Sequence, residues 1–402
     1  MNTAAIDLYS PDVYVDGAPH AALAELRRTT PVYWQDIPGQ PGYWAVLKHA
    51  DLVHVARHPL LFSAREGGIM LEDAPPGHLA MMRNTLLAMD PPRHVDFRRP
   101  LAPSFKAQVI SGLEERVRII CRQIFDEIGD AEVEFVHDVT SGLPSQVVGE
   151  LVGIPAEDWP RIHRWSEMNT SRQDPDFQQQ DGEDADPIMA MATYAIEFAG
   201  RRRQEAARLD LASLILGTEF GGQLMTDVEF GSFFVQLVGA GNDTTKTMLS
   251  SGLLALLQHP DQLAELRSDL SLIPGAVEEI LRFANPLHYF RRTATAATEL
   301  CGIQIAAGEK VAMYYTSANR DEDVFEESQR FDIHRHPNPH LSFGIAEHYC
   351  LGVHIARLEG RVFFEELLAT YPSIELTGEP VRTRSNLNNA LKYLPIRLRR
   401  GG

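Results

Sequence analysis

The chain has 402 residues, of which 44% are hydrophobic, so it is long enough to bury a large core. Its 37 basic and 55 acidic residues give a net charge of −18. Nucleic acid and anionic membrane surfaces both attract positively charged proteins, so this charge argues against either as a partner. We therefore expect an acidic, soluble enzyme.

The three cysteines, Cys121, Cys301 and Cys350, are few and widely spaced, which indicates no disulfide framework. The opening residues MNTAAIDLYSPD lack the pattern of a signal peptide, and no run of 18 apolar residues occurs. These features predict a cytoplasmic protein without a membrane anchor. Because no linker of useful length divides the chain, we expect a single domain over residues 1–402.

The predicted elements begin with a strand pair at residues 31–36 and 42–49, around the turn residues IPGQP. Helical periodicity dominates from about residue 94, with helices predicted at 107–128, 137–153 and 190–208. Between the last two, the polar and acidic segment 169–188 predicts a mobile surface loop.

The longest helical pattern covers residues 226–259 and is apolar nearly all round, which predicts a buried central helix. Residues 300–315 predict two short strands around Ala307-Gly308, and a last helix is expected from near Cys350 to about Leu368. The expected fold class is therefore mainly α with small β-sheets.

The most specific motif is FGIAEHYCLG, residues 343–352, in which Cys350 opens an amphipathic helix. A thiolate at a helix start is stabilised by free N–H groups and by the helix dipole. Phe343 and Gly344 predict a tight turn with a ring over the sulfur, and Gly352 predicts close backbone approach. The alternatives are a buried structural cysteine and a metal site made by His348, Cys350 and His354, which lacks a second cluster at zinc spacing.

This segment resembles the cysteine-ligand loop of the cytochrome P-450 superfamily, Phe-Gly-x-Gly-x-His/Arg-x-Cys-x-Gly, with Ala346 where the family usually has Gly. The resemblance extends over nearly the whole chain and is strongest to soluble bacterial members that oxidise terpenoids and steroids. It implies the cytochrome P-450 fold, with haem b (iron protoporphyrin IX) between the central helix and the loop. It also implies Cys350 as the iron ligand, and a thiolate ligand pushes electron density onto haem iron and so favours O–O cleavage in this family.

Two further motifs fall in the family's order. Glu279 and Arg282 in AVEEILRF share a helix face and resemble Glu-x-x-Arg, and Arg335 resembles the arginine that completes a buried ion network. In the central helix, Ala240-Gly241-Asn242-Asp243-Thr244 contains poor helix formers, and a Thr244 hydroxyl can bond the carbonyl of Ala240. The resemblance implies proton delivery by Thr244, with Asp243 as relay acid; an ordinary helix kink is the alternative.

Haem propionates need cations or hydrogen-bond donors. Four residues resemble the family's propionate-binding positions, and ordinary surface charge is the alternative for each: His94, Arg98, Arg292 and His340. Ala240, Phe343, Gly344 and Gly352 are expected beside the cofactor.

Segments that line the pocket in the family are mostly apolar here, which favours a hydrophobic alicyclic or aromatic substrate. His288 is the polar exception, and we expect it to bond the backbone rather than a substrate oxygen. The expected lining is Ile69, Met70, Met81, Met82, Leu86, Leu237, Val238, Leu287, His288, Phe290, Leu387 and Ala390.

Together these features predict a monooxygenase that inserts one atom of O2 into a hydrophobic small molecule. The resemblance implies electrons from a separate ferredoxin and its reductase, with Arg98, Arg99 and Arg357 as candidates for the docking face. Two alternatives stay open: another oxidation by the same family, such as epoxidation, aryl coupling or peroxide-driven chemistry, and a non-enzymatic haem protein that senses a ligand.

Overall fold

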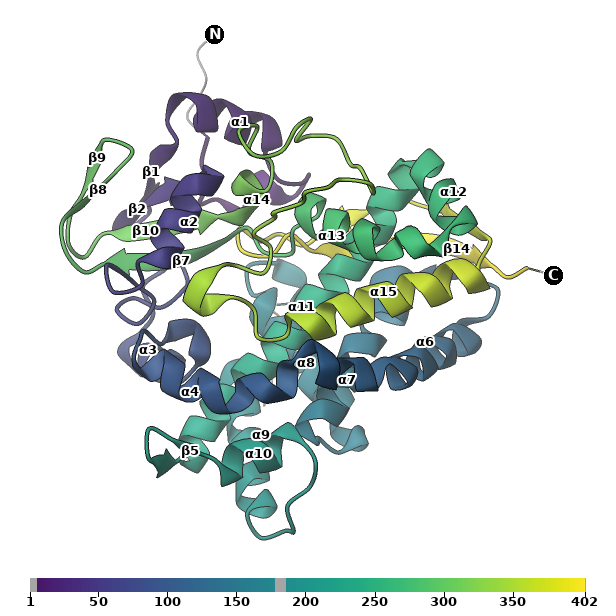
Figure 1. Ribbon diagram of the computed structural model, residues 1–402, viewed down its shortest axis with the longest axis horizontal. Coiled ribbons are helices and arrows are strands. Elements are labelled where there is room, and N and C mark those ends of the chain that lie inside the picture. Colours follow the sequence, from purple (N-terminus) through teal and green to yellow (C-terminus); the bar gives the residue numbers. More distant parts are fainter. Residues whose placement is uncertain (1–5, 178–185, 402) are drawn as a thin grey trace.

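The computed structural model describes residues 6–177 and 186–401. Helices form most of the body, and the strands form one five-stranded sheet and four smaller sheets among the described residues (Figure 1). The predicted mainly helical fold is therefore confirmed. None of the helices in the described ranges is both long and apolar enough to cross a membrane.

The central helix α11 (Asp227–Gln258) passes through the middle of the molecule (Figure 1). Thr226 and Glu229 form a capping box at its start, and Pro260 opens the next helix directly after His259. Helices α7 (Gly142–Val152), α8 (Trp159–Thr170) and α9 (Pro187–Arg202) pack against it. The helix predicted at 226–259 is confirmed to within one residue at each end.

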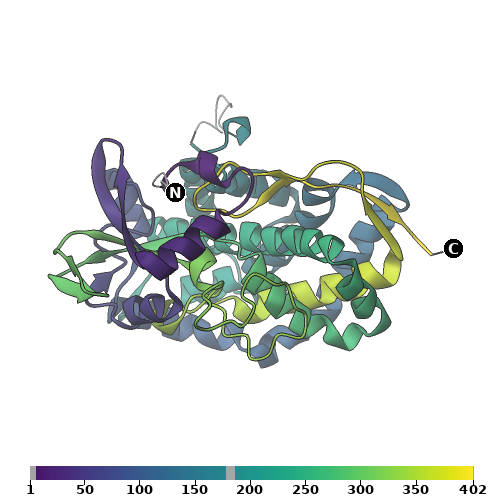
Figure 2. The same cartoon turned by 90° about the horizontal axis from the view of Figure 1, so that it is seen from above.

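The five-stranded sheet joins the N-terminal part of the chain to residues 289–314. Its strand order is β1 (Val32–Ile37), β2 (Gln40–Val46), β10 (Lys310–Tyr314), β7 (Tyr289–Ala294) and β3 (Phe62–Ser63). The β1–β2 pair confirms the predicted hairpin, β10 runs parallel to β2, and the other neighbours are antiparallel. Figure 2 shows this sheet at one end of the molecule and the C-terminus at the other.

Strands do flank Ala307-Gly308 as predicted, but they belong to different sheets. β9 (Ile303–Ile305) pairs with β8 (Thr298–Leu300), whereas β10 pairs with β2 and β7. All five residues of β10 are buried, which suits an interior strand, whereas β9 has an exposed middle residue. β10 is therefore an interior strand of the large sheet, whereas β9 belongs to a partly exposed two-stranded sheet.

Some predicted helix bounds are corrected. The segment 107–128 is broken into α5 (Ala107–Ile110), a 3-10 turn at Ser111–Leu113 that contains Gly112, and α6 (Glu114–Ile128). Helix α7 is preceded by a π-helical turn at Val136–Thr140, and α9 ends at Arg202 rather than near 208. Of the loop predicted at 169–188, residues 178–185 lie outside the described residues.

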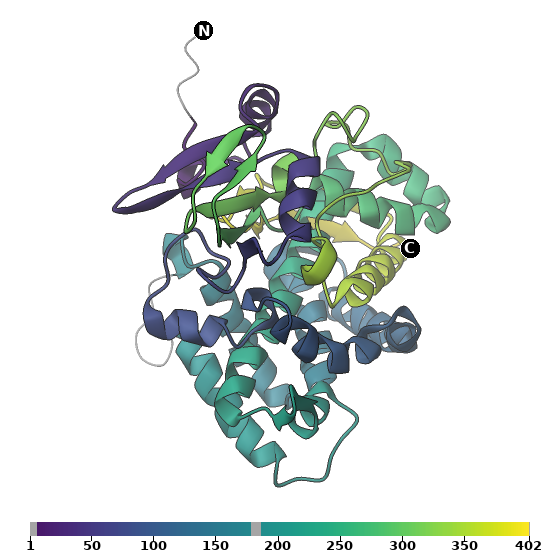
Figure 3. The same cartoon turned by 60° about the vertical axis from the view of Figure 1, so that its left-hand side comes forward.

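Figure 3 shows the N-terminal strands together with the strands of residues 289–314, and the helical part of the molecule beside them. Strands β11, β14 and β4 form a three-stranded sheet, and β5–β6 and β12–β13 form two-stranded sheets. The bounds are α1 (His20–Thr29), α2 (His49–Arg57), α3 (Pro76–Met82), α4 (Arg93–Leu101), α10 (Leu211–Gly217), α12 (Pro260–Ser268), α13 (Ile273–Phe283), α14 (Tyr315–Ala318), α15 (Val353–Thr370), β4 (Ala131–Glu134), β5 (Glu219–Phe220), β6 (Gln223–Leu224), β11 (Ser373–Leu376), β12 (Val381–Arg382), β13 (Leu391–Tyr393) and β14 (Pro395–Arg399).

Candidate active site

A cavity of about 570 Å³ lies between α11 and the loop that precedes α15. Ala240 and Thr244 line it from α11, and Phe343 and Cys350 line it from the loop. This volume falls in the range of small-molecule and cofactor sites, roughly 300–1,000 Å³. The cavity therefore brings together the two sequence motifs that carry chemistry.

The Cys350 loop is fixed by backbone hydrogen bonds. Cys350 N–H donates to Phe343 O at 2.8 Å, and Gly344 N–H donates to Leu341 O at 2.8 Å. Burial raises the pKa of the Cys350 thiol, whereas the Gly352 N–H and the Arg98 and Arg357 cations act in the opposite direction. Cation-rich surroundings of this kind favour a thiolate once a metal replaces the proton.

Two positions in this loop have a left-handed backbone. Gly344 has φ +67°, which glycine adopts without a steric penalty, and Ala346 has φ +60°. The methyl group at Ala346 therefore stands where the backbone favours glycine, as the family pattern has it. Gly352 has φ −84°, and no described protein atom lies within 4 Å of a Cβ built on it, so the neighbouring protein does not impose a glycine there.

Four basic side chains with few partners surround one part of the cavity: His94, Arg98, Arg292 and His348. Both ring nitrogens of His94 and Nε2 of His348 are buried without a hydrogen-bond partner among the described residues. The two rings lie 4.6 Å apart between centroids, and burial together with Arg98 and Arg292 lowers the pKa of His94 to about 4.

Unpaired buried donors are costly, typically about 1–3 kcal/mol each. A group with anionic oxygens would satisfy these four side chains, and the two propionates of haem b have that chemistry. The residues present therefore fit the cofactor that the sequence implies.

His340 is not part of this group, which corrects the sequence-based expectation. Its Nε2 lies 3.1 Å from Glu278 Oε2, its Nδ1 accepts from Ser342 N–H, and it does not line the cavity. Glu278 also accepts two hydrogen bonds from Arg357, at 2.6 and 2.7 Å. His348, two residues before Cys350, lies in the basic group where His340 was expected. The His/Arg position of the cysteine motif could have indicated this residue.

On α11, Thr244 Oγ1 donates to Ala240 O at 2.7 Å, the bond that the sequence predicts. Asp243 is buried, and its Oδ2 accepts hydrogen bonds from Thr170 Oγ1 at 2.7 Å and from Ser166 Oγ at 3.1 Å. Both residues line the cavity, but only the Asp243 side chain is held by hydrogen bonds from α8.

Asp243 is also paired with a buried cation that sequence reasoning missed. Lys246 Nζ lies 3.2 Å from Asp243 Oδ1 and donates to Glu167 Oε1 at 2.8 Å. Burial raises the pKa of Asp243, but Lys246 and His163 outweigh it, so the pKa lies below its usual value. The carboxyl group of Asp243 is therefore ionised at neutral pH. On the other side of Lys246, Glu167 Oε1 lies 3.8 Å from Nδ1 of the half-exposed His137.

Glu359 on α15 is a second missed residue. It is 1% exposed, lines the cavity, and neither carboxyl oxygen has a hydrogen-bond partner among the described residues. Burial raises its pKa to about 8, with Thr245 acting in the opposite direction. Glu359 is therefore a neutral acid at pH 7, and it lies near Thr245 of α11.

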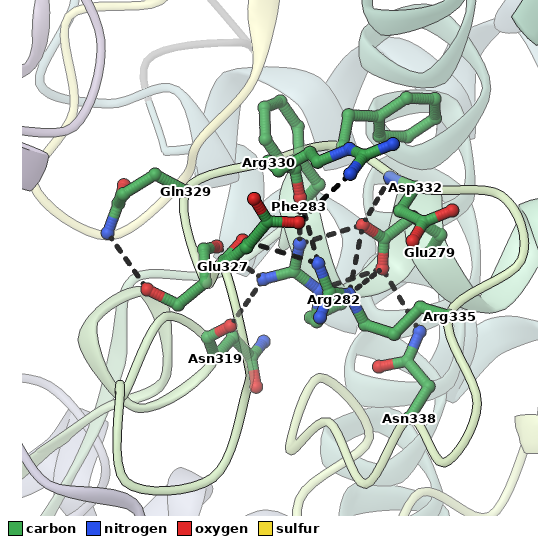
Figure 4. A network of polar contacts seen from close by, with 12 residues as sticks. Glu279, Arg282, Phe283, Asn319, Glu327, Gln329, Arg330, Asp332, Arg335 and Asn338 are labelled. Atoms are coloured by element: carbon green, nitrogen blue, oxygen red, sulfur yellow. Dashed lines mark hydrogen bonds and ion pairs between the residues drawn. The ribbon is translucent and has the colours of Figure 1, made fainter.

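Glu279, Arg282 and Arg335 come together as the sequence expects, away from the cavity (Figure 4). Arg282 donates to Glu279 twice, at 2.7 and 2.8 Å, and both side chains are fully buried. Arg335 Nε lies 3.2 Å from Glu279 Oε2. Arg282 also donates to the backbone carbonyls of Asn319, Ser328 and Arg330, which fastens the chain between α14 and the Cys350 loop.

Most of the expected substrate-contacting residues line the cavity: Ile69, Met70, Met81, Met82, Leu86, Leu237, Leu287, Phe290 and Leu387. Val238, Ala390 and His288 do not, which corrects three assignments. His288 is 1% exposed; its ring bonds the Thr316 hydroxyl at 2.9 Å rather than the backbone expected. The backbone N–H of His288 donates to Leu387 O at 2.7 Å.

A cysteine that shares a cavity with a long central helix, with buried basic groups for two carboxylates, defines a haem–thiolate protein. Comparison with known proteins agrees. The sequence profile described as Cytochrome P450 matches residues 174–394. The chain is 37% identical to "Putative cytochrome P450 126" of Mycobacterium tuberculosis, over all of both chains. It is 35% identical to "Steroid C26-monooxygenase" of Rhodococcus jostii, over 97% of this chain and 84% of that one.

Among solved structures, Mycobacterium marinum cytochrome P450 CYP268A2 in complex with pseudoionone superimposes with a TM-score of 0.86. That match has 36% sequence identity and covers 94% of each chain. The chain belongs to the cytochrome P450 family. It is accordingly a haem b monooxygenase, an oxidoreductase that uses O2, a hydrophobic substrate and redox partners.

Proposed function

We propose that the protein is a single-domain enzyme that inserts one atom of O2 into a C–H bond of a hydrophobic alicyclic or aromatic molecule, of the terpenoid or steroid kind. The observation that carries this proposal is that Cys350 and Thr244 line one cavity whose other walls are mostly apolar. When bound, the haem supplies the reductive activation of dioxygen. A steroid monooxygenase among the relatives is in keeping with such a substrate.

The roles of the chain's own residues follow from their surroundings. Cys350 would ligate the iron, and His94, Arg98, Arg292 and His348 would bind the propionates. Thr244 would hold a proton at Oγ1 in the wall of the cavity. Asp243, which is ionised at rest, would accept a proton and pass it on to Thr244, because its Oδ1 lies against Lys246 and the Glu167–His137 pair leads toward solvent.

A ligand screen followed by isotope labelling tests this proposal. Terpenoids, steroids and aromatic hydrocarbons are added to the ferric holoenzyme, and binding is measured from the shift of the Soret band. Compounds that bind are then incubated with ¹⁸O2, a reduced nicotinamide and a surrogate ferredoxin with its reductase. The product should carry one ¹⁸O atom. A bound compound that is never oxidised would instead favour the ligand-sensing alternative.

We further propose a ferredoxin as the electron donor, docking where α4 meets the Cys350 loop. Arg98 lines the cavity, and Arg357 is held by Glu278, so of the three expected docking residues Arg99 is the exposed one. Arg99→Glu should raise the KM for ferredoxin and leave substrate binding unchanged. Arg28→Glu on α1 serves as a charge-matched control, and equal effects of both variants would contradict docking at Arg99.

A further inference from the structure

Gln236 places a fixed amide in the wall of the cavity. Its Oε1 accepts a hydrogen bond from Leu86 N–H at 2.7 Å, and both residues line the cavity. An N–H can donate only to the oxygen of an amide, so this bond determines which end of the side chain faces Leu86. The other end must be the NH2 group.

That NH2 group has no hydrogen-bond acceptor among the described residues. No hydrogen bond from Gln236 Nε2 is found in residues 6–177 and 186–401. Of its neighbours on α11 that line the cavity, Val235 and Leu237 are apolar, and the Ser232 hydroxyl donates to Val228 O at 3.3 Å. A donor left over in such surroundings is satisfied only by what enters the cavity.

Gln236 also has a defined place relative to the reacting centre. It lies four residues before Ala240 and eight before Thr244, so the three residues follow one face of α11. With a rise of 1.5 Å per residue, Gln236 lies about 6 Å along the helix from Ala240 and about 12 Å from Thr244. A substrate that spans the cavity could bond Gln236 at one end while another carbon lies near Thr244 and Cys350.

We propose that Gln236 is a specificity-determining residue whose Nε2 donates a hydrogen bond to an acceptor oxygen of the substrate. The preferred substrate is then an apolar skeleton with a keto, ester, ether or hydroxyl oxygen, oxidised at a carbon remote from that oxygen. This inference rests on the proposed function and narrows its substrate class. The oxygen sets which carbon reaches the reacting centre, because Leu86 holds the donor in one orientation.

Asn169 on α8 is the competing candidate. It lines the cavity, and its side chain likewise makes no hydrogen bond within the described parts of the chain. No protein group orients its amide, however, and it lies outside α11. Gln173 is a second oriented amide, because it lines the cavity and its Oε1 accepts from Asn386 N–H at 2.9 Å, but it too lies outside α11. Gln236 is therefore the oriented donor on α11, and Asn169 and Gln173 become comparisons in the test.

The test measures Kd from the Soret shift for ligands that share a skeleton and differ in oxygen. Suitable probes are 5α-androstan-17-one with 5α-androstane, and 2-adamantanone with adamantane. Gln236→Leu removes the donor, and Gln236→Glu keeps an acceptor for Leu86 N–H while it replaces the NH2 group. Leu237→Ala controls for lost apolar contact, and haem content confirms that each variant is assembled.

Both Gln236 variants should weaken binding of the ketones by about five- to tenfold and leave the hydrocarbons within about twofold. Leu237→Ala should weaken ketone and hydrocarbon equally. Equal changes for both ligand classes in the Gln236 variants would overturn the inference. A ketone-selective loss in Asn169→Leu or Gln173→Leu, without one in the Gln236 variants, would also overturn it. If neither a ketone nor a hydrocarbon shifts the wild-type Soret band, the proposed substrate class fails and the inference fails with it.

Discussion

Thr244 Oγ1 donates a hydrogen bond to Ala240 O at 2.7 Å, across one turn of the buried helix α11. A side-chain hydroxyl bonded in this way competes with the backbone ladder and loosens the helix. Both residues line the cavity, opposite the loop that carries Cys350. The hydroxyl is therefore held in the wall of the cavity that the proposed iron ligand also lines.

Thr244→Ala should uncouple oxygen consumption from product formation. The variant should still bind haem and substrate, because Thr244 contacts neither the Cys350 loop nor the basic cluster by a described hydrogen bond. Product per reduced nicotinamide should fall by roughly tenfold or more, since a positioned proton donor contributes about 10²–10⁴ in rate. The remaining reducing equivalents should reduce O2 to hydrogen peroxide or water. Thr244→Ser retains the hydroxyl and should retain coupling, whereas wild-type coupling in Thr244→Ala would assign the proton to another group.

Glu359→Gln should remove a pH dependence from the stability of the protein. The folded carboxyl has a pKa of about 8, and its ordinary value is 4.5. The folded state therefore holds a proton that the unfolded state releases, so this residue lowers stability as the pH rises from about 4.5 to about 8. At pH 7 the substitution should stabilise the protein by roughly 3 kcal/mol, at 1.36 kcal/mol per pKa unit.

The measurement is the melting temperature of the holoenzyme at pH 5, 6, 7 and 8. The difference between Glu359→Gln and wild type should grow with pH. Exposed Glu115→Gln provides the control and should show no such trend. A difference that is constant across this range would mean that Glu359 is ionised in the folded protein.

Ala346→Gly should stabilise the Cys350 loop by about 1 kcal/mol. Ala346 has φ +60°, and a left-handed backbone costs a residue with a Cβ about 1–2 kcal/mol, which the greater freedom of glycine in the unfolded chain partly offsets. Urea unfolding followed by loss of the Soret band measures the change. An unchanged or lower midpoint would show that the methyl group makes contacts that outweigh the backbone strain.

Glu279→Ala should prevent stable haem incorporation. It leaves the fully buried Arg282 and the nearby Arg335 without their carboxylate, at a cost of about 3–5 kcal/mol. The ratio of haem to protein after purification measures the effect. Glu265→Ala removes an exposed partner of His334 and should change stability by at most about 1 kcal/mol. Normal haem content and melting in Glu279→Ala would contradict a structural role for the network.

Local patterns predicted much of this arrangement. The Thr244–Ala240 bond and the Glu279–Arg282 pair each join residues three or four apart on one helix, so helical periodicity is enough to place them. The central helix and the first hairpin followed from apolar periodicity and turn residues. These are relationships between neighbours in the sequence.

Apart from the Asp243–Lys246 pair, which lies within one turn of α11, the missed contacts join distant segments. Lys246 and Glu167 are 79 residues apart, and nothing in either segment indicates that they pair. His340 and His348 both precede Cys350. Only the structure shows that the ring of His340 is bonded to Glu278 from α13, which leaves His348 for the cavity. Gln236 is one polar residue in an apolar run until its bond to Leu86, 150 positions away, gives it a direction.

Ligation of iron by Cys350 is the central claim, and the spectrum of the reduced carbon-monoxide adduct tests it most directly. The wild-type holoenzyme should show the strongly red-shifted Soret band of thiolate-bound haem. Cys350→His should lose that band and retain a haem with imidazole character, because the basic cluster around His94 and His348 is unchanged. Cys121→Ser, at a buried cysteine away from the cavity, should keep the band. A red-shifted band that survives in Cys350→His would contradict the account.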